Sequence, residues 1–228
     1  MRPPLFREHL EVRGNGQFRL WRSVATASDP PAPVGRFAGS LPPGEIEALN
    51  EAGRRAAGEG PRTWLISPDS PVDWLAVDDA TAVLGIHDAG DGAWAALADL
   101  MRPLLADLTR SPVAAIALEL DGGARLAHRG TESIEIDLSD LVVRAVHWRD
   151  GQSEARWTAP RGAEGVVGAG PGWSLAVPLE HGFDLEAGDR VTVSATFAAR
   201  DGDEMVPVGL LAYWTGTTEK NSIVKEEK

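Results

Sequence analysis

The hydrophobic periodicity of the chain changes after Pro112, and this change limits the fold more than any other feature of the sequence. Beyond that point apolar and polar residues alternate, as they do around Ile134, Ile136 and Leu138. Alternation of this kind places every second side chain on one face of a β-strand. Turn-forming residues separate such runs at short intervals. We therefore predict about seven or eight short strands in residues 112–215, arranged as an antiparallel β-sandwich or an open barrel.

The middle of this half contains a predicted hairpin and a predicted loop. Strands are expected at Val142–Trp148 and Glu154–Thr158, with a turn at Asp150-Gly151 between them. The preceding run, Ser133–Leu141, is expected to form a strand of its own. Residues 160–172, PRGAEGVVGAGPG, are predicted to be a long glycine-rich connection, because they lack the Gly-Lys-Ser/Thr ending of a phosphate loop and no predicted helix follows them.

The first half of the chain mixes strands with two predicted helices. Gly14-Asn15-Gly16 separates two strand-like runs and predicts a hairpin, because Gly and Asn accept the positive φ of tight turns. A helix is expected to begin at Pro42-Pro43-Gly44-Glu45 and to end at Gly58 and Gly60. Residues 93–109 carry apolar side chains at helical spacing and predict the second helix.

Two further features of this half are predicted. Asp91 is expected to cap the second helix, since a short acidic side chain can accept from its first backbone N–H groups. The run VGRFAGSL, residues 34–41, is strand-like, but its glycines are expected to weaken it as a central strand.

These patterns predict an α+β protein with a mixed strand and helix region followed by an antiparallel β-sandwich-like half. We expect a small α+β domain at 1–111 and a sandwich or open barrel at 112–216. Lysine is absent from residues 1–219 and occurs three times in the run TTEKNSIVKEEK. We therefore expect residues 217–228 to be a disordered or foreign tail.

Composition narrows the classes of partner and cofactor. The formal net charge of −12 repels phosphate backbones, which disfavours nucleic-acid binding, and it favours a basic partner. The absence of cysteine excludes disulfides, zinc–thiolate sites and a cysteine nucleophile. No apolar run is long enough to span a membrane and no signal peptide is visible, so a cytoplasmic protein is expected.

Catalytic motifs are missing from the sequence. It has no Gly-x-Ser-x-Gly elbow, no Ser-x-x-Lys set and no histidine pair at metal-ligand spacing. We therefore predict a protein that is not an enzyme and that holds no cofactor or metal. The alternative is a hydrolase or metal enzyme whose site is assembled from distant residues, for instance His128, His147 and His181 with a carboxylate.

Tryptophan supplies the candidate binding residues, since the chain has eight Trp and one Tyr. Trp is enriched where proteins bind partners, although in strands it usually packs in the core. Alternation places His147 and Trp148 on opposite faces of a strand, so one of the two points outward. Trp157 and Trp173 flank the glycine-rich connection and would frame a surface at one rim of the sandwich. We predict a binding or scaffold protein that engages a protein partner through Trp148, Trp157 and Trp173, and whose strand edges also allow a homodimer.

The segment FRLWR followed by VGRFAGSLPPGEIEAL, within residues 18–49, resembles the emfourin-type protealysin inhibitors. Those proteins have a strand, a turn that contains Phe-Ala-Gly, and a helix that opens with a small or proline residue and Glu. The resemblance covers under a quarter of the chain. It implies a second function, a protease inhibitor that acts through the N-terminal region.

Overall fold

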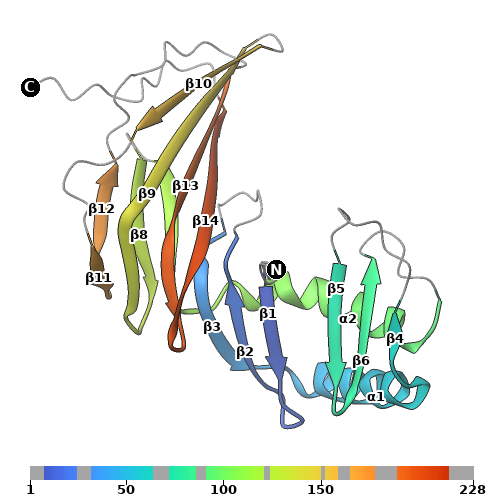
Figure 1. The fold of residues 1–228 in the computed structure, drawn as a ribbon. Coiled ribbons are helices and arrows are strands. Elements are labelled where there is room, and N and C mark those ends of the chain that lie inside the picture. Colours follow the sequence, from blue (N-terminus) through green and yellow to red (C-terminus); the bar gives the residue numbers. More distant parts are fainter. Residues whose placement is uncertain are drawn as a thin grey trace, which may run out of the picture. The chain divides into compact units, whose positions relative to one another are not determined.

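The computed structural model describes residues 8–24, 32–63, 72–85, 91–120, 124–149, 152–158, 165–177 and 189–215. Within these residues the chain forms two helices and fourteen strands, so the protein is α+β and mostly β (Figure 1). Both helices were predicted from the sequence. The predicted tail, residues 217–228, lies outside the described residues. No described helix has the length and apolar character needed to cross a bilayer.

The chain divides into two compact units, which interleave along the sequence. One contains Met1–His9, Leu20–Ala38 and Ser111–Lys228, and the other contains Leu10–Arg19 and Gly39–Arg110. The predicted boundary near residue 111 thus coincides with one crossing between the units. Whether 1–111 and 112–216 fold as separate domains stays a prediction.

Two sheets enclose the core of the first unit. One has the strand order β1-β2-β3-β7-β8-β12 and the other the order β10-β9-β13-β14, with β11 also paired to β9. Side chains from both sheets meet in one hydrophobic cluster, in which Ile116 and Leu126 of the first sheet and Val143 and Val191 of the second are fully buried. The strands of the first sheet are β1 (Glu8–Val12), β2 (Gln17–Arg22), β3 (Val34–Ser40), β7 (Pro112–Leu120), β8 (Ala124–Gly130) and β12 (Ser174–Val177). Those of the second are β9 (Ile134–Arg149), β10 (Gln152–Thr158), β11 (Val166–Ala169), β13 (Arg190–Asp201) and β14 (Glu204–Thr215).

The second unit is built around a small sheet and the two helices. Its sheet has the order β4-β6-β5, with β4 at Arg62–Thr63, β5 at Val72–Val77 and β6 at Ala80–Gly85. The helices are α1 (Pro43–Glu59) and α2 (Ala93–Leu108), and Ala56, Leu84 and Trp94 are fully buried between these elements. The indole Nε1 of Trp94 donates a hydrogen bond of 2.9 Å to the carbonyl oxygen of Gly60, so the start of α2 is joined to the end of α1.

Asp91 does not cap α2, contrary to the prediction. The N-cap residue is Gly92, and no side-chain hydrogen bond from it satisfies the first turn. Instead, Oε1 of Glu59, the last residue of α1, accepts a hydrogen bond of 2.7 Å from the backbone N–H of Ala93. A carboxylate is favourable at this position because it faces the positive end of the helix dipole. A residue 34 positions away provides the acceptor, and for this reason the local sequence pattern did not reveal it.

The predicted separate strands at Ser133–Leu141 and Val142–Trp148 are one continuous strand, β9. Its alternation slips at Ser139 and Asp140, which are both exposed, and the pairing with β13 shifts between Thr196 and Ala198. Between these pairs β9 advances five residues, from Val142 to Asp137, while β13 advances two, so β9 carries three additional residues there. A bulge with an odd number of additional residues reverses the periodicity of a strand without ending it. In the sequence this reversal looked like a break between strands.

Two further expectations about glycine were wrong. The predicted glycine-rich loop at 160–172 contains a short strand, β11, which pairs with β9 from Val166↔Asp137 to Ala169↔Ile134. The run at 34–41 forms β3, which lies inside the first sheet between β2 and β7. Gly35 does not weaken it: a side chain there would stand 2.4 Å from the carbonyl oxygen of Ala114, so the close approach of the two strands requires glycine.

The hairpins predicted from turn residues are present. β1 and β2 are neighbours joined at Arg13–Gln17, where Gly16 N–H donates to the Arg13 carbonyl at 2.8 Å. β10 pairs antiparallel with β9 from Gln152↔Arg149 onward, although the turn itself, at Asp150-Gly151, lies outside the described residues.

Candidate binding face

Trp148 lies near the end of β9 on the side of the sheet that faces away from the core. Along this strand Val143 and Ala145 are buried, whereas Trp148 is 39% exposed. The side chain of its neighbour His147 is 12% exposed and lies on the opposite side. The prediction that one of these two residues points outward is thus confirmed, and Trp148 is the outward one.

Strand register shows which residues share this side with Trp148. Trp148 pairs with Ser153 on β10 and with Arg190 on β13. Two residues further along β13, Thr192 pairs with Val146 on β9 and with Tyr213 on β14. Tyr213 is 36% exposed. Paired residues in an antiparallel sheet project from the same face. We name as the outer face those residues on this side, between the bulge and the end of β9, whose side chains the structure describes: Val142, Arg144, Val146, Trp148, Ser153, Arg190, Thr192, Ser194, Thr196, Leu211 and Tyr213.

The outer face differs from the rest of the chain in its charge. The whole sequence has 34 acidic residues and a net charge of −12, yet none of the residues of the outer face is acidic and two are arginines. Among the described residues on this side of β9, carboxylates occur beyond the bulge, at Glu135 and Asp137.

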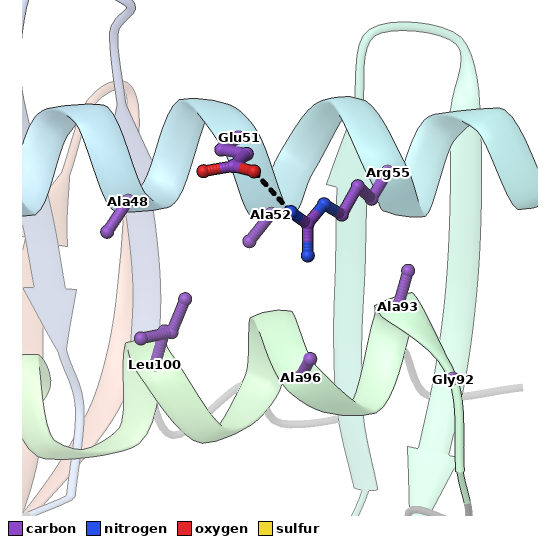
Figure 2. Close-up of a pocket in the computed structure, with 8 residues that line it drawn as sticks. All are labelled: Ala48, Glu51, Ala52, Arg55, Gly92, Ala93, Ala96 and Leu100. Atoms are coloured by element: carbon purple, nitrogen blue, oxygen red, sulfur yellow. Dashed lines mark hydrogen bonds and ion pairs between the residues drawn. The ribbon is translucent and has the colours of Figure 1, made fainter.

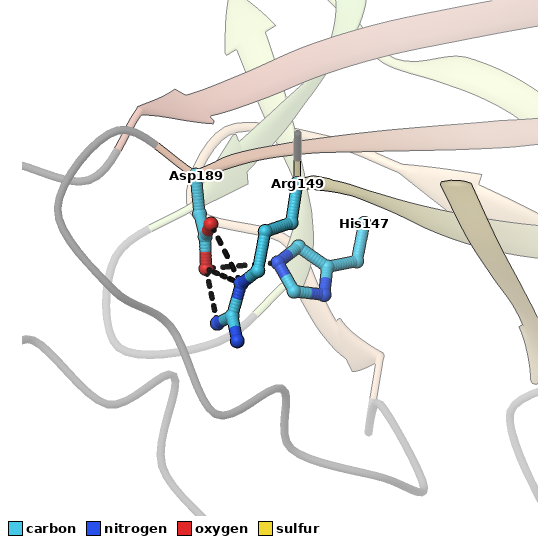
Figure 3. Close-up of polar contacts among 3 residues, drawn as sticks. All are labelled: His147, Arg149 and Asp189. Atoms are coloured by element: carbon cyan, nitrogen blue, oxygen red, sulfur yellow. Dashed lines mark hydrogen bonds and ion pairs between the residues drawn. The ribbon is translucent and has the colours of Figure 1, made fainter. Parts of the chain in front are cut away.

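A buried carboxylate holds the strand that presents Trp148. Asp189, directly before β13, is 3% exposed and accepts hydrogen bonds from both neighbours of Trp148 (Figure 3). Its Oδ2 lies 2.9 Å from Nε2 of His147 and 2.6 Å from Nη2 of Arg149, and its Oδ1 lies 3.0 Å from Nε of Arg149. Two-point contact between a guanidinium and a carboxylate has a fixed geometry. The strand end on either side of Trp148 is thereby joined to β13.

The other two predicted residues are placed differently. Trp173 precedes β12, is partly buried and packs against the core of the first unit. Its backbone carbonyl accepts a hydrogen bond of 3.0 Å from the N–H of His128. Trp157 pairs with Arg144, so the register assigns it to the same side of the sheet as Trp148, but its side chain lies outside the described part of the structure. Whether the three tryptophans bind a partner together stays a prediction.

The histidines of the proposed metal site have separate partners. His128 is 7% exposed, and its Nε2 donates to the carbonyl oxygen of Glu132 at 2.7 Å, while its buried Nδ1 has no hydrogen-bond partner among the described residues. His147 belongs to the other sheet, on β9, and contacts Asp189, which directly precedes β13. His181 lies outside the described residues. Among the residues that the structure describes, no three His, Asp or Glu side chains are arranged to hold a metal ion.

A concave feature lies between the two helices of the second unit. It is a cavity of about 480 Å³ whose lining includes four alanines, with Ala48 and Ala52 on α1 facing Ala93 and Ala96 on α2 (Figure 2). The two charged side chains in its lining, Glu51 and Arg55, form an ion pair with each other. Methyl groups and a self-paired ion pair provide few directed contacts for a ligand. We therefore regard the outer face as the better candidate.

One titratable group near the end of β13 departs from its ordinary behaviour. The pKa of Asp201 is raised, chiefly because burial disfavours the charged carboxylate. Glu204 raises the pKa further, whereas the positive charges of His9 and Arg36 act against the shift. A carboxylate with a raised pKa in the folded state reduces stability at pH values where it must be ionised.

We expect Asp201→Asn to stabilise the protein at neutral pH. Both the folded and the unfolded chain carry a protonated Asp201 well below the ordinary pKa of 3.8, so the variant should match the wild type there. As the pH rises through the raised pKa the wild type loses stability relative to the variant. Urea unfolding at several pH values between 3 and 7 measures this difference in stability. Asp203→Asn, a substitution at an exposed position in a turn, is the control. A lower unfolding midpoint for Asp201→Asn at pH 7 would contradict burial as the dominant effect.

Comparison with protein-family models, curated proteins and solved structures finds no match to this chain.

Proposed function

We propose that this protein is a non-enzymatic binding protein that engages another protein through the outer face. The observation that carries the proposal is the exposure of Trp148, Tyr213 and Val142 on one face of a regular sheet, among residues that include no carboxylate. Exposed aromatic and apolar side chains that lie together on a surface usually mark an interaction site. Trp, Tyr and Arg are also the residues most often found to dominate binding energy at protein interfaces.

The setting of these side chains supports a rigid binding surface. We interpret the two sheets that share one core as a β-sandwich, and β9 and β13 lie in the middle of one of its sheets. Side chains on central strands lose little conformational freedom on binding, because the backbone beneath them is already ordered. The contacts of Asp189 with His147 and Arg149 add local rigidity next to Trp148. A broad sheet face suits a macromolecule, whereas small ligands are usually bound in enclosed pockets.

Quantitative affinity capture tests the proposal. A tagged chain is used to capture proteins from cells of the source organism, and each captured protein is quantified for wild type, Trp148→Ala and Tyr213→Ala. We expect one partner to be retained at least about tenfold less by the variants, since loss of an interface hot spot costs about 2 kcal/mol or more and each 1.4 kcal/mol is about tenfold in affinity. Both variants should keep the urea midpoint of the wild type because the side chains are exposed.

Val166→Ala is the matched control. Val166 is 55% exposed and lies on β11, where it pairs with Asp137 beyond the bulge in β9 and so outside the outer face. It should retain the partner as well as the wild type does. Equal retention by all variants would place the binding site elsewhere, and unfolding of Trp148→Ala would show that this side chain is structural.

The inhibitor function remains a second prediction. The helix opening implied by the resemblance is present at the start of α1, where Glu45 lies in the first turn. The Phe37-Ala38-Gly39 motif, however, lies within β3 and does not form a turn. Absence of metalloprotease inhibition by the full chain at micromolar concentration would exclude this function. A hydrolase or metal enzyme would be recognised by metal bound in the purified protein or by activity lost to a chelator.

A further inference from the structure

We infer that the partner segment bound by the outer face is acidic. The inference rests on the proposed function and adds the chemistry of the partner to it. It is carried by the contrast between the outer face, which has two arginines and no acidic residue, and a chain whose net charge is −12.

Arg190 is the residue that most directly selects for negative charge. It is exposed, it pairs with Trp148 across β9 and β13, and no carboxylate in the described part of the chain forms an ion pair with it. A guanidinium beside an aromatic ring offers a planar fork of donors that matches a carboxylate at two points. A Glu or Asp of a partner would thus contact Arg190 while its neighbours pack on Trp148.

Arg144 is the second arginine on the same face. It is exposed on β9 and pairs with Ser194 on β13, four residues along β9 from Trp148. Strands advance about 3.3 Å per residue, so this spacing corresponds to about 13 Å along β9. The exposed Val142 and Tyr213 lie in the same part of the sheet. The matching partner is a short segment that combines acidic residues with apolar ones.

The range of electrostatic forces explains why a short segment is favoured over a large anion. At physiological ionic strength the field of distant charges is screened beyond about 8 Å. The electrostatic energy of an acidic side chain in contact with Arg190 is therefore dominated by its attraction to the arginine. An extended polyanion is also repelled by the surrounding carboxylates, beginning with Glu135 and Asp137 on β9. Nucleic acid and a uniformly anionic membrane are disfavoured on this ground.

A peptide-display selection on the full-length chain tests the inference. A library of random twelve-residue peptides is selected on immobilised wild type, and the net charge of the enriched sequences is compared with that of the starting library. We expect enrichment of peptides with acidic and apolar residues. Their affinity should fall about tenfold or more for Arg190→Glu, and it should also fall as salt is raised. Arg19→Glu, at an exposed position on β2, is the charge-matched control and should bind like the wild type.

The outcomes separate this inference from the proposed function. Enrichment of neutral or basic peptides that still require Trp148 would overturn the inference and leave the binding function in place. Peptides that bind Trp148→Ala as well as wild type would count against both. Absence of any enrichment would overturn the inference, while affinity capture tests the binding function independently. Sedimentation of a dimer that Arg190→Glu dissociates would also overturn it, because a second copy of the chain would then occupy the face.

Discussion

Gly35→Ala is expected to lower the free energy of unfolding by more than about 3 kcal/mol. Gly35 lies in β3 with φ near +132°, a conformation that residues with a side chain rarely adopt. A Cβ atom there would stand 2.4 Å from the carbonyl oxygen of Ala114 and 2.7 Å from its neighbour's Cα atom, and both of these are backbone atoms of the adjoining strand. The clash can be relieved only by separating β3 from β7, which would open the core of the first unit. Urea denaturation followed by circular dichroism measures the loss.

Gly168→Ala is the matched control for this experiment. Gly168 also lies in a strand, β11, but no atom stands within 4 Å of a side chain built there, and its φ is not positive. Its replacement should change stability by no more than about 0.5 kcal/mol. Equal stability of Gly35→Ala and the wild type would mean that β3 does not approach β7 as closely as the structure shows.

Asp189→Ala is expected to cost about 2–3 kcal/mol of stability. Asp189 is 3% exposed, and its carboxylate accepts from both His147 and Arg149. Its removal eliminates the hydrogen bonds that both side chains make to this carboxylate at the edge of the core. Part of the cost is offset because the side chain of Arg149 is 37% exposed and can be hydrated. Thermal and urea unfolding of the variant measure the effect.

Asp203→Ala serves as the control for Asp189→Ala. It removes the same group from an exposed position in the turn between β13 and β14 and should be nearly neutral. Amide hydrogen exchange at the end of β9 adds a local readout, because loss of the Asp189 contacts should speed exchange near Trp148. Unchanged stability and exchange in Asp189→Ala would show that the carboxylate does not hold the strand end.

The elements of the fold were predictable where their signal is local. The hairpin at Gly14-Asn15-Gly16 follows from turn chemistry, and α1 follows from its proline opening and glycine ending. The inward position of Ile134, Ile136 and Leu138, which are all buried, follows from alternation. These features depend on neighbours in the sequence, and a single sequence contains that information.

The errors arose where distant residues decide the local structure. The acceptor at the start of α2 comes from Glu59 and not from nearby Asp91, since helix packing brings the end of α1 close to Gly92. The bulge in β9 is visible only in its register with β13. The glycine of β3 that was expected to weaken the strand is required by the proximity of Ala114. Propensity describes a residue in isolation, and tertiary contacts override it at each of these positions.

The candidate site was predictable only in part. Alternation along β9 identified Trp148 and His147 as opposite in orientation, and exposure then distinguishes the two. The role of Asp189 was missed because 40 residues separate it from Arg149. The absence of acidic residues from the outer face was also missed, because that face is assembled from four strands whose order the sequence does not contain.

Hydroxyl-radical footprinting of the free protein and of its complex is the measurement that tests the binding face most directly. Trp148 and Tyr213 are exposed in the free protein and should be oxidised readily. In the complex captured through the tagged chain we expect their oxidation to fall severalfold, while the exposed Leu100 on α2 keeps its rate. Protection at Leu100 with unchanged oxidation of Trp148 and Tyr213 would contradict the account and move the binding site to the helices of the second unit.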